Sequence, residues 1–171
     1  MSEDEANIQR TLIIFKPDSV QRGVVGEILS RFERVGLKIV GAKMLLPTHD
    51  QLYEHYETIG KMITRRGQEA FDSNVNFMMQ GPIIMMVLEG VEAVSLVRKL
   101  VGSTEPKSAL VGTVRGDYSH ISFGYANTQG KSTPNLIHAS GDITEAKNEI
   151  DYWFADSELY SYNVLNEKYT R

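Results

Sequence analysis

The chain contains no cysteine among its 171 residues. Disulfide bonds, thiolate metal sites and cysteine nucleophiles are therefore excluded, and the composition gives no reason to invoke an oxidising compartment. The sequence also lacks any apolar stretch that approaches the roughly 20 residues needed to span a bilayer. Its first residues, MSEDEANIQ, are acidic and polar, whereas a signal peptide would be basic and then apolar. These absences predict a cytoplasmic protein with no membrane association.

An excess of positive charge is also missing. Lys and Arg number 18 against 22 Asp and Glu, which gives a net charge of -4. An acidic balance argues against a broad nucleic-acid footprint, so an anionic substrate would need a local group of cations. An RNA-binding sheet, which would need a basic surface and aromatic residues on its strands, is disfavoured.

The length and the 42% hydrophobic content favour one compact domain, because a chain of this size buries about 70% of its unfolded surface. We expect residues 1–9 to be a disordered tail and residues 10–171 to form a single domain. No internal repeat or linker divides the chain.

Short apolar runs alternate with segments of helical period. Pro17 ends the first run at Lys16, because proline has no amide hydrogen and disfavours helix in the residue before it. Thr48 can cap a helix that Gly60 would end. Asp142 can cap another, whose apolar face would hold Ile143, Ala146, Ile150 and Phe154. The predicted strands are RTLIIFKP, LKIVGAKMLL and PIIMMVL, and the other predicted helices begin at Val24, at GQEAFDSNVNFMMQ and at VEAVSLVRKLVG.

This order predicts an α/β sandwich of ferredoxin-like type, with a βαββαβ core in which helices pack on an antiparallel sheet. The longest irregular stretch, YSHISFGYANTQGKSTPN, predicts a surface loop around a short strand at Ile121 to Phe123. It leads directly to His138, and loops beside a scaffold often carry chemistry.

His138 has two interpretations. A lone histidine beside Leu136 and Ile137 is usually structural, but it can also be a nucleophile. Lys16 at a strand end, with Arg98 and Arg115 on either side of a glycine-containing loop, could form a phosphate cradle. Taken singly, each is an ordinary surface cation, and spacing along the chain does not show that they converge.

Several motifs, in order, resemble those of the nucleoside diphosphate kinase family. They are RTLIIFKPDSVQRGVVGEILSRFERVGLKIV, HY, GP, RKLVGSTEP, GTVRGD, NLIHAS and EIDYWF, which run from Arg10 to Phe154. The resemblance implies that His138 takes the γ-phosphate from a nucleoside triphosphate and passes it to a diphosphate. It further implies that Glu149 orients the histidine ring, and that the contacts to phosphate and ribose come from Lys16, Tyr56, Arg98, Thr104, Arg115 and Asn135.

The resemblance also implies Mg²⁺ bridging the nucleotide phosphates and a homo-oligomer. Neutral imidazole is nucleophilic near pH 7, and a carboxylate on its second nitrogen fixes the tautomer. A phosphoryl group in transfer spreads charge over its oxygens, so fixed positive charge stabilises the transfer. No carboxylate cluster in the sequence needs to serve as a metal cage.

The departures from the family gather on the nucleobase side. Extra residues lie near 60–70 and 118–133, and the family's short basic-Pro-aromatic signal is absent. We expect phosphotransfer with a rebuilt base site, which leaves four aromatic candidates open: Phe71, Tyr118, Phe123 and Tyr125. The alternative is a non-catalytic nucleotide-binding module, and a phosphohistidine at His138 separates the two.

Overall fold

A computed structural model describes residues 7–165 and 167–170 of the chain. Its sheet has four strands, β1 (Ile8–Phe15), β2 (Lys38–Leu45), β3 (Ile83–Val91) and β4 (Ile137–Ala139), in the order β2-β3-β1-β4. All neighbouring strands are antiparallel. The predicted ferredoxin-like fold is confirmed. Because β1 begins at Ile8, the sheet starts before residue 10, and residues 1–6 of the expected tail lie outside the described residues.

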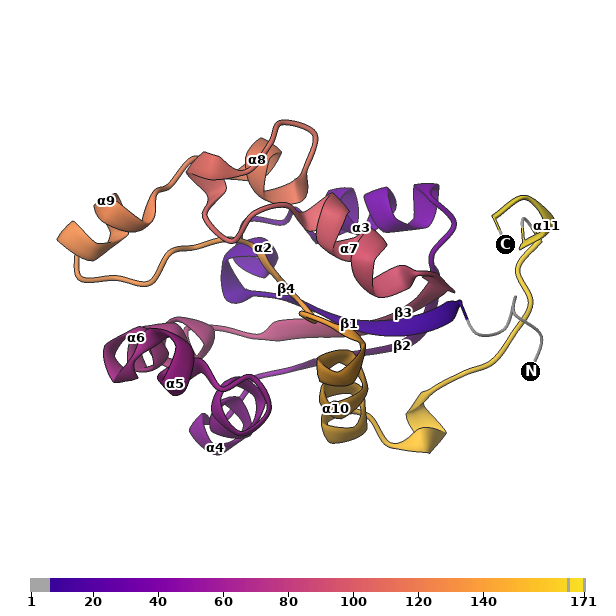
Figure 1. Cartoon of the computed structure of the whole chain (residues 1–171), viewed down its shortest axis with the longest axis horizontal. Coiled ribbons are helices and arrows are strands. Elements are labelled where there is room, and N and C mark those ends of the chain that lie inside the picture. Colours follow the sequence, from indigo (N-terminus) through magenta and orange to yellow (C-terminus); the bar gives the residue numbers. More distant parts are fainter. Residues whose placement is uncertain (1–6, 166, 171) are drawn as a thin grey trace.

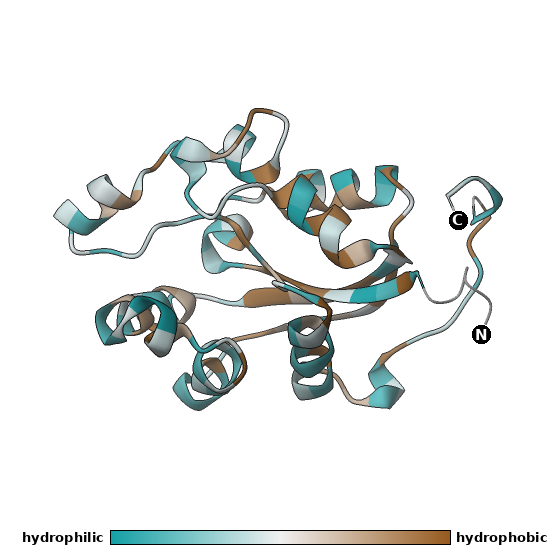
Figure 2. Ribbon diagram, in the orientation of Figure 1, coloured by the Kyte–Doolittle hydropathy of each residue, from teal (hydrophilic) through white to brown (hydrophobic). Residues whose placement is uncertain are grey.

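Helices cover both faces of the sheet (Figure 1). Successive strand side chains point to opposite faces, so Leu12 and Ile14 of β1 enter one core while Ile13 and Phe15 enter the other. The first core packs against α4 (His49–Tyr53), α6 (Gln68–Met78) and α10 (Ile143–Trp153), and the second against α3 (Val25–Arg34) and α7 (Ala93–Val101). Figure 2 shows the resulting hydrophobic colouring along the strands.

The predicted helix caps are present. The Thr48 side chain accepts the backbone N–H of Gln51 at 3.2 Å, and the Asp142 carboxylate accepts that of Glu145 at 2.8 Å. The helix that follows Thr48 changes after α4 into a π-helix, η1 (Glu54–Ile59), and ends at Gly60. The remaining helical segments are α2 (Pro17–Gln21), α5 (Met62–Arg66), η2 (Pro106–Ser108), α8 (Val114–Tyr118), α9 (Phe123–Thr128), η3 (Asp156–Glu158) and α11 (Glu167–Thr170). None of the helices in the described part of the chain has the length and apolar character needed to cross a bilayer.

Two local predictions were wrong. The strand expected at Ile121 to Phe123 is absent, because the Ser122 side chain accepts the N–H of Tyr125 and starts helix α9 at Phe123. Ile143 was expected on the buried face of α10, but it is 61% exposed. It lies in the first turn, and the buried face of the helix begins only at Ala146.

Candidate active site

A single cleft of about 1770 Å³ gathers the residues that the resemblance singled out. It lies between the sheet end and the segments that follow α5, α7 and α9. All eight predicted site residues line it, and they come from six separate parts of the chain: Lys16, Tyr56, Arg98, Thr104, Arg115, Asn135, His138 and Glu149. The convergence that sequence spacing could not show is therefore present in the tertiary structure.

The backbone that carries His138 is held in an uncommon conformation. Leu136 has a φ of 72°, in the left-handed region that a branched side chain seldom adopts. Its N–H donates to Asp18 at 3.0 Å, and its carbonyl accepts the N–H of Lys16 at 2.9 Å. Such strain costs about 1–3 kcal/mol and persists where neighbouring contacts impose it. Strand β1 and helix α2 thus fix the position of the histidine.

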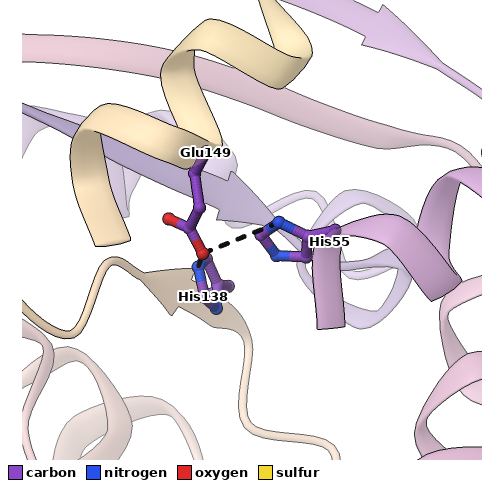
Figure 3. A group of neighbouring side chains, drawn as sticks. All are labelled: His55, His138 and Glu149. Carbon is purple, nitrogen blue, oxygen red and sulfur yellow. Dashed lines mark hydrogen bonds and ion pairs between the residues drawn. The ribbon is translucent and has the colours of Figure 1, made fainter. Parts of the chain in front are cut away.

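His138 makes a direct hydrogen bond to Glu149. The distance from His138 Nε2 to Glu149 Oε1 is 2.8 Å, and the Glu149 side chain is only 1% exposed (Figure 3). A carboxylate accepts hydrogen bonds, so this contact places the imidazole proton on Nε2 and leaves the lone pair of Nδ1 for chemistry.

The charge state of His138 suits a nucleophile. Burial lowers the pKa of His138 to about 3, with Glu145 opposing and the cations Lys16, Arg115 and Arg98 adding to the shift. Burial raises the pKa of Glu149, whereas the nearby His55 and a hydrogen bond from Ser140 act in the opposite direction. The imidazole is therefore neutral at pH 7, as nucleophilic attack requires.

Arg115 is buried and held rigidly beside the histidine. Its guanidinium donates to three backbone carbonyls, those of Asn135 at 3.1 Å, Gly102 at 3.0 Å and Ile137 at 2.6 Å. A guanidinium has five N–H groups, so two remain for an anionic ligand. Its geometry suits phosphate oxygens, and little side-chain entropy is left to lose on binding.

Lys16 lies at the end of β1 and faces the same cleft. It is buried, and burial together with the charge of Arg115 lowers the pKa of its ammonium group to about 8. Arg98 also lines the cleft. Lys16, Arg98 and Arg115 repel one another in this cleft, and a bound polyphosphate would relieve that repulsion.

Several side chains in the cleft hold buried polar atoms without hydrogen-bond partners in the described part of the chain, and Asn135 and Tyr56 are among them. Asn135 donates from Nδ2 to the carbonyl of Thr104 at 2.9 Å, but its Oδ1 is buried and unpaired. The hydroxyl of Tyr56, on the π-helix η1, is likewise buried, and it makes no hydrogen bond of normal geometry although the Asn74 side chain lies nearby. Unpaired buried polar atoms cost about 1–3 kcal/mol, and a substrate with complementary groups recovers that energy. Short π-helical segments are frequent at functional sites.

Three of the cleft residues that sequence reasoning missed are notable for their chemistry. His55 lies beside His138, and the centroids of the two rings are 4.6 Å apart. The sequence offered only its place in the HY motif, next to Tyr56. Arg65 and Arg66 of helix α5 also line the cleft. No sequence signal distinguished them from solvated surface cations, because the local pattern does not show which elements helix α5 faces.

The aromatic candidates for the nucleobase separate clearly. Phe71 is 1% exposed and lies in the core. Tyr118 does not line the cleft, and its hydroxyl donates a hydrogen bond of 2.8 Å to Glu27. Tyr125 is 57% exposed but does not line the cleft. Of the four candidates, Phe123 alone lines it. It stands at the start of helix α9, within the segment 118–133 where we expected extra residues.

Comparison with known proteins agrees with this arrangement. The profile of the family described as nucleoside diphosphate kinase matches residues 9–159. The nucleoside diphosphate kinase of Borreliella burgdorferi is 46% identical over 160 residues, which cover 94% of this chain and 95% of that protein. A solved transition-state mimic of the Borrelia burgdorferi enzyme, with bound vanadate and ADP, has a TM-score of 0.93 at 43% identity and covers 97% of this chain and 99% of that chain. A halophilic nucleoside diphosphate kinase from Halobacterium salinarum, in complex with CDP, has a TM-score of 0.81 at 35% identity and covers 95% of this chain and 98% of that chain.

Proposed function

The chain belongs to the nucleoside diphosphate kinase family, and from this premise we propose that His138 carries the phosphate as a phosphohistidine. The protein is a phosphotransferase that moves phosphate between nucleotides. The observation that carries the assignment is the position of His138 in the cleft, bonded through Nε2 to Glu149 and flanked by buried cations.

The proposed reaction has two displacement steps at the same atom. His138 Nδ1 attacks the γ-phosphorus of a nucleoside triphosphate, the bond from that phosphorus to the β-γ bridging oxygen breaks, and the diphosphate leaves. A terminal oxygen of a second diphosphate then attacks the phosphohistidine and regenerates the neutral ring. Glu149 accepts a hydrogen bond from Nε2–H of His138 throughout and stabilises the positive charge that develops on the ring.

We assign the surrounding residues according to the part of the nucleotide, phosphate or ribose, that each would contact. Arg98 and Arg115 stabilise the equatorial oxygens of the transferring group and its neighbours, because planar guanidinium groups pair with phosphate oxygens. Thr104 and Tyr56 add hydrogen bonds to the phosphates. Lys16 and Asn135 hold the ribose hydroxyls, an assignment that the unpaired Oδ1 of Asn135 supports.

We propose that Mg²⁺ enters with the nucleotide and is held by its phosphate oxygens. Among the described residues, His55, His138 and Glu149 form one group of candidate metal ligands, with ligand atoms within 4.8 Å of one another. Two nitrogens and one oxygen do not match the all-oxygen set that Mg²⁺ prefers. When bound, the ion neutralises phosphate charge, and this chain contributes the cations around it.

Phe123 is our candidate for stacking against the nucleobase. It is 37% exposed, lines the cleft, and its N–H donates to Glu105 at 2.9 Å, which anchors the start of α9. An aromatic ring stacks on every base, so this contact binds the base without selecting one.

A labelling experiment tests the proposed function. The protein is mixed with γ-labelled ATP and Mg²⁺, and an unlabelled diphosphate is added afterwards. We expect acid-labile label on the protein that passes to the diphosphate, no label in His138→Ala, and normal labelling in the control His120→Ala, whose exposed histidine lies outside the cleft. ATP binding without labelling would instead indicate the non-catalytic nucleotide-binding module.

We also propose that the protein forms a homo-oligomer and resides in the cytoplasm. Leu110 and Val111, which are 78% and 91% exposed, are apolar surface that self-association could bury. Sedimentation velocity over a range of concentrations tests the first proposal, and a monomer at every concentration would contradict it. Cell fractionation tests the second.

A further inference from the structure

The buried histidine beside the nucleophile has a defined tautomer. The indole Nε1–H of Trp153 lies 3.2 Å from Nδ1 of His55, and both side chains are buried. An indole N–H can only donate, so Nδ1 of His55 must offer its lone pair. The ring proton of His55 therefore resides on Nε2.

The same nitrogen lies close to the carboxylate that His138 uses. Nδ1 of His55 is 3.6 Å from Oε1 of Glu149, and Oε1 is the oxygen that Nε2 of His138 contacts at 2.8 Å (Figure 3). If Nδ1 carried the proton, His55 would donate toward that oxygen and compete with His138 for it.

In this tautomer, one ring nitrogen of His55 lacks a hydrogen-bond partner in the described part of the chain. Its Nε2 is buried without a hydrogen-bond partner among the described residues, although it carries the proton. If the proton moved to Nδ1, Nε2 would no longer be an unpaired donor, and the new N–H would lie near the carboxylate of Glu149. This change by itself lowers the free energy. The Trp153 N–H opposes this change, because two N–H groups cannot point at each other.

We propose that Trp153 acts as a tautomer lock, keeping Nδ1 of His55 unprotonated so that Oε1 of Glu149 is reserved for His138. This inference rests on the proposed function of His138. Trp153 and His55 are positioning residues in this scheme, since they act through Glu149. The lock joins α10 to the π-helix η1, so the nucleophile depends on a contact between two elements distant in sequence.

Replacing the indole by a ring without an N–H tests the lock. In Trp153→Phe, we expect the proton of His55 to move to Nδ1 and the rate of phosphohistidine formation to fall about twofold to tenfold, the effect of weakening one hydrogen bond. KM should stay within about twofold, because no substrate contact is removed. Tyr152→Phe is the matched control, since it changes the adjacent aromatic residue and leaves the indole in place.

Two readouts separate this role from simple packing. Nitrogen-15 NMR of the histidine rings reports which nitrogen carries the proton, and it is measured without nucleotide. The double variant Trp153→Phe, His55→Leu lacks the competing donor, so its rate should recover above that of Trp153→Phe. A packing role predicts a further loss in the double variant.

Clear outcomes would overturn the proposal. In the unaltered chain, a proton on Nδ1 of His55 would exclude the lock, and this measurement does not depend on any variant folding. A tautomer shift in Trp153→Phe with an unchanged labelling rate would show that His55 does not compete for Glu149. Failure of the unaltered chain to form phosphohistidine would instead refute the proposed function, while the tautomer would still be measurable.

Discussion

The hydroxyl of Ser140 donates a hydrogen bond of 2.6 Å to Oε2 of Glu149, while His138 contacts the other carboxylate oxygen, Oε1. Ser140 is fully buried and in turn accepts the backbone N–H of Leu12 at 3.2 Å. A continuous series of hydrogen bonds thus runs from the central strand β1 to the nucleophile. Each member has a partner on both sides, which limits how far Glu149 can move.

Removing the hydroxyl of Ser140 should impair the chemical step. In Ser140→Ala, Glu149 loses one of its two donors, so its carboxylate is less well oriented and its pKa rises further. We expect kcat to fall about tenfold, which corresponds to one hydrogen bond to a charged group, with little change in KM. Steady-state kinetics measure this, with Ser30→Ala, on α3 and outside the cleft, as control. An unchanged kcat would show that Glu149 is held without Ser140.

The buried Lys16 predicts an alkaline limit to activity. Its lowered pKa, about 8, means that the ammonium group is charged below this pH and loses its charge as the pH rises through it. Since the role proposed for Lys16 requires the charged form, kcat/KM should decline above about pH 8. Lys16→Arg should move this limb to higher pH, and Lys43→Arg, outside the cleft, should leave it in place. A limb that does not move in Lys16→Arg belongs to another group.

Truncating Phe123 should weaken nucleotide binding without affecting the chemical step. In Phe123→Ala, loss of one stacking contact, about 1–3 kcal/mol, should raise KM about fivefold or more for purine and pyrimidine nucleotides alike, with kcat nearly constant. Tyr125→Ala, on the same helix but outside the cleft, is the control. If both variants retain the original KM, the base stacks elsewhere.

Two glycines should differ in their tolerance of a methyl group. In Gly116→Ala, the added Cβ would clash with the backbone carbonyl of Leu110, whereas at Gly124 the nearest atom is Ser122 Oγ at 4.0 Å. Overpacking against backbone costs about 1–3 kcal/mol, so Gly116→Ala should lower Tm by about 5 °C. Gly124→Ala should keep Tm unchanged or raise it by a few degrees, because the site is open and alanine favours helix α9 more than glycine does. Thermal unfolding followed by circular dichroism compares the two, and equal Tm values would contradict the clash.

The sequence alone determined the elements whose signals are local. The apolar runs and helical periods predicted β1, β2, β3, α3, α7 and α10, because burial of one face selects the period and a capping side chain selects the start. The motif resemblance identified the family and the residues around His138. Signals of these kinds need only neighbours along the chain.

Tertiary structure decided what depends on contacts between distant segments. It brought Lys16, Arg115 and His138 into one cleft. At Ile121 to Phe123 it replaced the expected strand by the start of helix α9, which the Ser122 side chain caps. It also placed His55 and Trp153 against Glu149. Hydrogen-bond direction and burial belong to the folded arrangement, because each depends on groups that lie far apart in the chain.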